Sequence, residues 1–141
     1  MPQKNKPCPC QSTLDYAICC GRYHQGKIHA PTAEALMRSR YTAYLMGNAQ
    51  YIYRTWHEKT RPSLKSLRDS EPQKLVSLKI LSTQAGGIDD DKGMVEFVAS
   101  YENPAVDSKD GVNASEEPIQ QHKEKSLFVK VKGRWLYIDA I

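Results

Sequence analysis

The feature that most constrains this chain is its set of four cysteines, all of which lie within the first twenty residues. They form two tight pairs, Cys8 with Cys10 and Cys19 with Cys20, separated by eight residues. Neither pair suits an ordinary disulfide, because neighbouring cysteines close an S–S bond only with strain. A tetrahedral zinc ion accepts such pairs at Zn–S distances near ~2.3 Å where the chain turns sharply. We therefore predict that residues 8–20 fold around a structural Zn²⁺ held by the four cysteines.

Two alternatives to the four-cysteine site remain open. His24, four residues after Cys20, could replace one sulfur in a Cys₃His site. The thiols could also be free or redox-active in a flexible tail. A catalytic zinc site keeps one position open to water or substrate, whereas four protein ligands close it. The predicted metal therefore stabilises a fold and performs no chemistry.

The position of the cysteines also bears on the compartment. None of them can link the main body of the chain, which favours a reducing environment. No apolar run approaches the ~18 residues of a membrane helix, and the first residues lack the apolar segment of an export signal. We expect a cytoplasmic protein without a membrane span.

Basic residues are concentrated near the cysteines. The formal net charge is +4 at pH 7, and residues 1–29 contain four Lys or Arg against a single Asp. Four thiolates around a divalent ion add about −2, which leaves the metal-bound segment slightly positive. This is a mild reason to expect an anionic partner such as a ribosomal surface or a nucleic acid.

The cysteine segment resembles the SEC-C motif, a small zinc module also found at the C-terminus of the SecA translocation ATPase, in its string CPCQSTLDYAICCG. The resemblance places the zinc ligands at the four cysteines. The segment departs from the commonest form of the motif at Gln11-Ser12-Thr13, where Gly-Ser-Gly is usual. This departure affects the local turn and leaves the ligands in place.

Two later segments resemble the uncharacterised bacterial YchJ family: LMRSRYTAYLMGNAQYIYRTWH from Leu36 and WLYIDA from Trp135. The resemblance implies a SEC-C zinc module over residues 1–31 and a nuclear transport factor 2-like (cystatin-like) domain over residues 32–141. Many members carry a second SEC-C motif at the C-terminus. This sequence ends at Ile141 without one, which puts in question any function that needs two zinc modules.

Hydrophobic periodicity predicts helices in the first half of the domain. Apolar residues recur at helical spacing over residues 32–45, with Thr32 as the N-cap and Gly47 as the stop. Asn48 caps a second helix, and a third covers residues 62–68. The buried face of the second helix is predicted to contain Ala49, Ile52, Tyr53 and Trp56.

After Pro72 the apolar period changes to two, which predicts strands. The alternating apolar positions are Val76, Leu78 and Ile80, then Val95, Phe97, Ala99 and Tyr101, then Leu127, Val129 and Val131, followed by a strand from Trp135 to Ile138. Residues 86–93 are expected to form a turn without a metal, and residues 102–121 a long mobile hairpin loop. The fold class is therefore α+β, with helices against one face of a curved antiparallel sheet.

Arg40 is the unusual residue of the domain, because it falls within the apolar stripe of the first helix. An unpaired buried charge costs several kcal/mol, so its guanidinium needs partners. It could form a structural pair with Asp139 or Glu124, extend to solvent, or form the floor of a pocket for an anionic or carbonyl ligand. The walls of that pocket would be Tyr41, Tyr44, Trp56 and His57, the last of which is also placed to cap the end of the second helix.

The sequence does not indicate an enzyme, since it has no nucleophile with an evident base, no phosphate-binding loop and no dinucleotide fingerprint. The family tends to read His-Glu-Arg-Ser near residue 124; only Glu124 and Ser126 match, and His122 receives no role. The first functional hypothesis is a non-enzymatic adaptor whose SEC-C module docks a protein or a ribosomal surface. The second is a small-molecule binder or enzyme that uses the concave face of the sheet. Nucleic-acid binding, with stacking on Tyr16, Tyr23 and His24, is the third.

Overall fold

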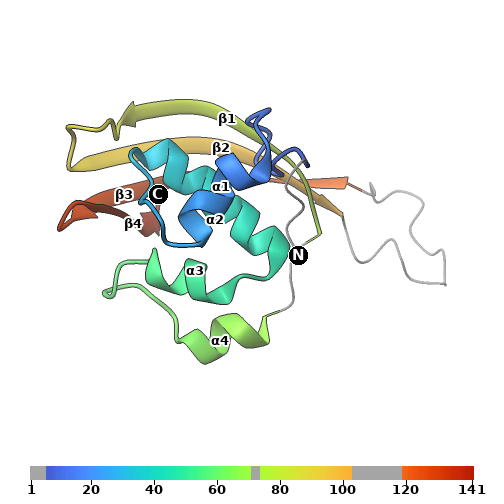
Figure 1. Ribbon diagram of the computed structural model, residues 1–141, viewed down its shortest axis with the longest axis horizontal. Helices are drawn as coiled ribbons and strands as arrows, with labels where there is room; N and C mark the ends of the chain where they lie inside the picture. Colours follow the sequence, from blue (N-terminus) through green and yellow to red (C-terminus); the bar gives the residue numbers. More distant parts are fainter. Residues whose placement is uncertain (1–5, 71–73, 103–118) are drawn as a thin grey trace.

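The computed structural model describes residues 6–70, 74–102 and 119–141. Within them, helices come first and strands follow (Figure 1). The helical elements are a 3₁₀ turn η1 (Tyr16–Ile18), α1 (Cys20–His24), α2 (Ala33–Met46), α3 (Ala49–Arg54) and α4 (Leu64–Asp69). The strands are β1 (Leu75–Ala85), β2 (Lys92–Glu102), β3 (Ile119–Val131) and β4 (Arg134–Ala140).

The predicted helix caps are confirmed. The Thr32 hydroxyl accepts a hydrogen bond from the backbone N–H of Ala35 at the start of α2, and Gly47 ends that helix with φ 72°. The Asn48 side chain accepts from Tyr51 N at the start of α3. A short polar side chain before a helix satisfies a backbone donor that would otherwise lack a partner, which is why these positions fix the helix starts.

The second helix ends earlier than predicted. It stops at Arg54, and Thr55 to His57 leave it to pair with β4: Tyr137 N donates to Thr55 O and His57 N donates to Tyr137 O, each at 2.8 Å. Trp56 therefore lies in an isolated parallel bridge to Tyr137 and not in a helix, and the prediction that His57 closes the helix was wrong. The hydrogen-bonding groups of the β4 edge outweigh the weak helical preference of these residues.

The four strands form one antiparallel sheet in the order β1-β2-β3-β4. The turn between β3 and β4 is the predicted two-residue one, with Lys132 and Gly133 both at positive φ, as a tight hairpin requires. The predicted turn at 86–93 is also confirmed, and the Asp90 carboxylate accepts from Gly87 N within it. The predicted loop at 102–121 falls mostly on residues 103–118, outside the described residues.

The structure decides which side chains face the helices, a choice that alternation along the strands left open. On β3 the buried positions are Ser126 and Phe128, the latter 1% exposed, whereas Val131 is exposed. Apolar residues occupy both phases of this strand, so the alternation alone could not decide which set faces the helices. On β1, Val76 is exposed because a register irregularity between Leu75 and Ser77 shifts the strand. On α3, the buried tyrosine is Tyr51, and Tyr53 is half-buried.

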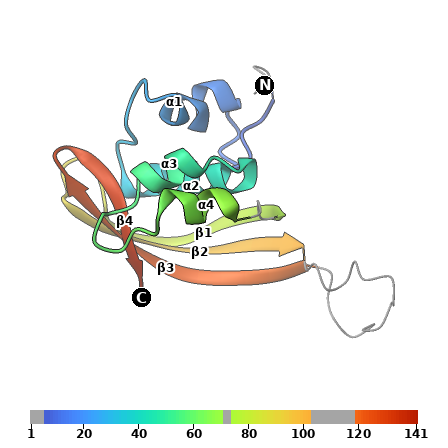
Figure 2. The ribbon, with the colours of Figure 1, turned by 90° about the horizontal axis from the view of Figure 1, so that it is seen from below.

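All the helices lie on one face of the sheet, and α2 lies between the N-terminal cysteine segment and the sheet (Figure 2). Its start is fixed to the β1–β2 hairpin, where Ala33 N donates to Gly86 O at 2.9 Å. At this contact a Cβ on Gly93 would lie 2.5 Å from Gly86 Cα, so the close approach requires glycine. No helix formed by the described residues is long and apolar enough to span a bilayer.

Candidate functional site

The first candidate site is the cysteine cluster on the side of α2 that faces away from the sheet. The four sulfur atoms all lie within 4.8 Å of one another, and all four residues are buried. Two of them come from the turn after Pro7 and two from the junction of η1 and α1. In that turn Gln11 and Thr13 have positive φ angles of 66° and 72°, the conformation that glycine adopts most easily. The turn therefore forms without the glycines usual in the motif.

The sulfur arrangement fits a tetrahedral metal ion bound by thiolates. Zn–S bonds of ~2.3 Å correspond to sulfur separations of roughly 3.8 Å, and Cys10 and Cys19 are 3.6 Å apart. Hydroxyl groups lie against the sulfurs: Thr42 donates to Cys20 Sγ at 3.4 Å, and Ser12 Oγ lies 3.0 Å from Cys19 Sγ. Such hydrogen bonds support negatively charged sulfur. Four buried sulfur ligands close the coordination sphere, so a metal here would hold the fold without binding a substrate.

His24 lies beside the cluster with both ring nitrogens engaged elsewhere. Its Nε2 donates to the carbonyl of Ser39 on α2 at 2.8 Å, which leaves Nδ1 to accept from the Tyr16 hydroxyl, also at 2.8 Å. The ring packs against Tyr16 and Tyr51, and burial lowers the pKa of His24. This geometry favours the four-cysteine set over the Cys₃His alternative and makes His24 a link between α1 and α2.

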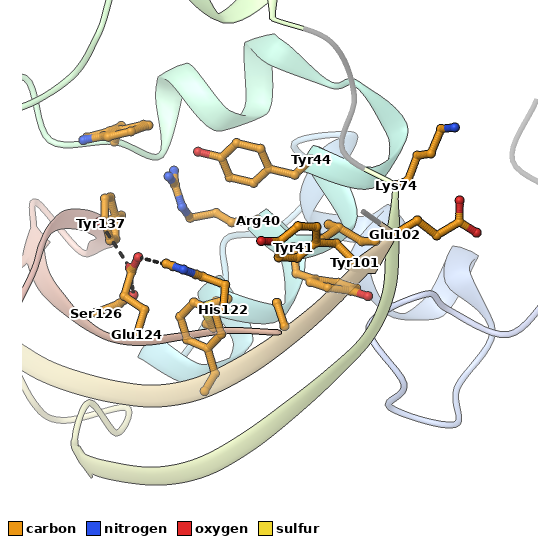
Figure 3. Close-up of a pocket in the computed structure, with 15 residues that line it drawn as sticks. Arg40, Tyr41, Tyr44, Lys74, Tyr101, Glu102, His122, Glu124, Ser126 and Tyr137 are labelled. Atoms are coloured by element: carbon orange, nitrogen blue, oxygen red, sulfur yellow. Dashed lines mark hydrogen bonds and ion pairs between the residues drawn. The ribbon is translucent and has the colours of Figure 1, made fainter. Parts of the chain in front are cut away.

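The second candidate site is a cavity of about 700 Å³ between α2 and the concave face of the sheet (Figure 3). Its polar groups include Arg40 and Tyr41 from α2 and His122, Glu124 and Ser126 from β3, and Lys74 and Glu102 also belong to the lining. The apolar and aromatic side chains that complete the lining include Met37, Tyr44, Trp56, Phe97, Tyr101 and Tyr137.

Arg40 is 5% exposed and is held by neutral groups. Its Nη1 donates to Ile52 O at 3.0 Å and to Thr55 Oγ1 at 2.9 Å. Its guanidinium carbon lies 4.7 Å from the ring centroid of Tyr137 and 5.0 Å from that of Trp56. These rings provide cation–π attraction, but burial still lowers the pKa of Arg40.

The predicted structural pair between Arg40 and a carboxylate is not formed. None of the ion pairs between described residues, at a limit of 4.0 Å, includes Arg40. The Asp139 carboxylate accepts instead from Ala140 N on the exposed end of β4, and the Glu124 carboxylate is engaged by other side chains. Arg40 is also too buried to extend to solvent. The cavity floor therefore carries a cation with no carboxylate of the described residues within 4.0 Å; burial lowers the pKa of Arg40, and the surrounding tyrosines and the more distant Glu124 carboxylate offset this shift only in part.

Tyr41 contributes to the cavity a polar group without a hydrogen-bond partner in the described part of the chain. It is 3% exposed, and its hydroxyl is the buried side-chain polar atom, among the described residues, for which no hydrogen-bond partner is found. Burial raises the pKa of this phenol, so the group is a neutral donor. Buried polar atoms nearly always have partners, and the exceptions point to strain, water or a ligand.

Three polar side chains on β3 form a connected group that sequence reasoning missed. Ser126 Oγ donates to Glu124 Oε2 at 2.6 Å, Tyr137 OH donates to the same oxygen at 3.4 Å, and His122 Nε2 lies 3.1 Å from Glu124 Oε1. Residues two apart on a strand share a face. The recurrence of polar residues at 122, 124 and 126 was therefore an available signal, but apolar residues in both phases of β3 obscured which positions face the helices.

The structure brings together four of the five predicted pocket residues: Arg40, Tyr41, Tyr44 and Trp56. His57 is not part of the cavity lining. Its Nδ1 accepts from Lys59 N at 3.1 Å on the exposed loop after Trp56, because the chain has already left α3 at that point.

Comparison with protein-family models identifies two regions. Residues 32–140 match the description "YchJ, middle NTF2-like domain", and residues 5–22 match the SEC-C motif. The first region contains the residues that line the cavity, and the second contains the four cysteines.

The chain is also similar to curated relatives and to solved structures over most of its length. The chain is 50% identical to a UPF0225 protein of Cupriavidus pinatubonensis over 95% of its length and 87% of the relative's, and 41% identical to one of Streptomyces coelicolor over 95% and 94%. A solution structure of a SEC-C motif containing protein from Rhodopseudomonas palustris matches with a TM-score of 0.77 at 29% identity, over 96% of this chain and 98% of that one. A crystal structure of such a protein from Psychrobacter arcticus also matches with a TM-score of 0.77, at 27% identity over 99% and 84%.

Proposed function

Because the chain belongs to the YchJ (UPF0225) family, in which a SEC-C motif accompanies a nuclear transport factor 2-like domain, we propose that it binds a small organic anion in the cavity of that domain. A Zn²⁺ ion held by Cys8, Cys10, Cys19 and Cys20 stabilises the fold. We place this activity in the cytoplasm, where the thiols stay reduced.

The observation that carries the proposal is the buried Arg40 without a carboxylate partner at the floor of an open cavity. A buried charge is expensive unless an opposite charge accompanies it. The two neutral acceptors, the aromatic rings around Arg40 and the more distant Glu124 carboxylate compensate this cost only in part. An anionic group of a ligand, placed beside the guanidinium, would complete the pair with charge-assisted hydrogen bonds.

The size and lining of the cavity restrict the rest of the ligand. Its volume of about 700 Å³ lies within the range of small-molecule sites, and its walls are mostly aromatic or apolar. The Tyr41 hydroxyl supplies one further donor inside the cavity. The ligand class is therefore a compact, largely apolar or aromatic organic acid with an additional hydrogen-bond acceptor.

Isothermal titration calorimetry of the zinc-loaded chain with matched small molecules tests this proposal. Phenylacetate and phenethylamine have similar size and opposite charge, and we expect the acid to bind at least ~100-fold more tightly. Arg40→Met should remove this preference, whereas Arg38→Met, on the other face of α2, should keep it. Equal or absent binding of both molecules by the unmodified chain would refute the assignment of an anion site.

Docking of a partner through the SEC-C module is a second candidate function. The module exposes three large aliphatic side chains, Leu14 at 45%, Ile18 at 56% and Ile28 at 43%. Apolar groups on a surface favour a protein partner over a nucleic acid. Co-purification from cells should then lose a specific partner when Leu14 and Ile18 are both changed to Ser in the full chain, and should keep it in the Arg40→Met variant. A partner that stays bound to the double variant contradicts this role.

A further inference from the structure

The cavity contains a histidine, His122, that lies within hydrogen-bond distance of a carboxylate. The binding of an anion does not require such a pair. His122 and Glu124 lie two residues apart on the concave face of β3, and Ser126 lies two residues further. In Figure 3 the His122 ring and the Glu124 carboxylate point toward each other along the wall opposite Arg40 and Tyr41. Polar groups on both walls thus face the same space.

The hydrogen bonds around Glu124 fix its carboxylate. Oε2 accepts from the Ser126 and Tyr137 hydroxyls, and Oε1 is left for the imidazole of His122. A carboxylate that accepts from Nε2–H holds a neutral histidine in the tautomer whose Nδ1 carries the lone pair. This is the arrangement in which a third group orients a general base. The His122 side chain is 58% exposed, so a proton taken up by it can exchange with solvent.

Tyr41 provides the complementary group on the facing wall. Its buried hydroxyl has no partner among the described residues and is neutral. A preorganised donor that faces the cavity stabilises negative charge that develops on a substrate oxygen. The arrangement therefore suits a substrate with a carbonyl oxygen beside Tyr41, which donates a hydrogen bond to it, and an acidic C–H bond beside His122, which accepts the proton.

We propose that His122, positioned by Glu124, transfers a proton to and from the carbon next to a carbonyl group in an aromatic 2-oxo acid bound in this cavity. The inference rests on the proposed anion site, with Arg40 holding the carboxylate. The C3–H bond breaks and its proton moves to His122 Nδ1. Its electron pair forms the C2–C3 double bond, and the carbonyl π pair moves to the oxygen that accepts from Tyr41. Return of a proton to C3 restores the ketone, so the reaction needs no oxidant, reductant or cofactor.

Phenylpyruvate is the probe, because it combines an aromatic ring, a carboxylate, a ketone and acidic C3 protons. In D₂O, the zinc-loaded chain should accelerate loss of the C3 proton NMR signal, with a rate that saturates in phenylpyruvate. His122→Gln should lower kcat by about 100-fold or more, while the calorimetric Kd for phenylpyruvate stays within about twofold. The same substitution at exposed His29 is the matched control and should change neither value.

Glu124 is a positioning residue, and its variants separate this role from a structural one. Glu124→Gln should lower kcat by at least ~10-fold with little change in KM, because the amide no longer selects the His122 tautomer. Glu124→Asp should restore part of kcat.

The outcomes distinguish the two proposals. If phenylacetate binds but phenylpyruvate does not exchange above background, or exchanges equally fast with His122→Gln, proton transfer is refuted and anion binding stands. If neither acid binds, both proposals fail.

Discussion

The two faces of α2 differ in how their polar groups are satisfied. On the face toward the cysteine cluster, the buried polar side chains have partners: Ser39 bonds Tyr51, Thr42 bonds Cys20, and His24 bonds the Ser39 carbonyl. On the face toward the sheet, Arg40 lacks a carboxylate and the Tyr41 hydroxyl lacks any partner among the described residues. One helix thus presents a closed structural face and an incomplete one beside a cavity. The difference indicates where a ligand belongs, because native interiors seldom leave such groups unmatched.

The largest expected effect comes from disrupting the metal site on the face of α2 whose buried polar groups have partners. Chelation of the metal, or Cys20→Ser, should lower the free energy of unfolding by more than ~4 kcal/mol, since metal binding in small thiolate modules is coupled to folding. Thermal unfolding with and without chelator, together with metal analysis, measures this.

Ser12→Ala is the control for that experiment, because it removes a hydroxyl beside Cys19 and no ligand. We expect it to cost only about 1 kcal/mol. If a chelator left the melting temperature of the chain unchanged, the cysteine cluster would not stabilise the fold through a bound metal.

A pair of tyrosines tests the comparison most directly. Tyr51→Phe removes a buried hydroxyl that lies 2.7 Å from Ser39 Oγ, and should destabilise the chain by about 1–2 kcal/mol. Tyr41→Phe removes a hydroxyl with no partner, and should change stability by less than ~0.5 kcal/mol or increase it. Urea unfolding of both variants gives the two values. Equal losses would mean that the Tyr41 hydroxyl is satisfied by a bound water and that the asymmetry is only apparent.

The turn of the cysteine segment holds one residue in an unfavourable backbone conformation. Thr13 has a φ of 72°, which is unfavourable for a β-branched residue. Thr13→Gly should therefore raise the free energy of unfolding by about 1 kcal/mol. Thr13→Ala, which keeps a Cβ, is the matched control. A gain from alanine as large as that from glycine would place the cause in the side chain and not in the backbone.

The sequence was sufficient where chemistry is local. The spacing of the cysteines predicted that four sulfurs converge, and Thr32 and Asn48 marked helix starts that the structure confirms. Arg40 was correctly placed on a buried helical face. Each of these conclusions depends on residues a few positions apart.

The errors arose where distant segments meet. The partners of Arg40 were predicted as carboxylates, but the chain supplies them from Ile52 and Thr55, because α3 ends early and joins β4. Apolar residues in both phases of β3 concealed which side faces the helices. That choice is made by packing against α2, and it determines that Glu124 lines the cavity.

The hydrogen bonds from α2 to the cysteine segment have a consequence for how this protein can be rearranged. Arg38 donates to the Cys10 carbonyl at 2.6 Å, and Thr42 donates to the Cys20 sulfur. The cysteine segment therefore depends on α2 for hydrogen bonds to its backbone and to one of its sulfurs. If the cysteine segment were transferred to another protein, the host would need a helix with donors at the positions of Arg38 and Thr42. Exchange of this segment between proteins is therefore constrained even where the motif itself is kept.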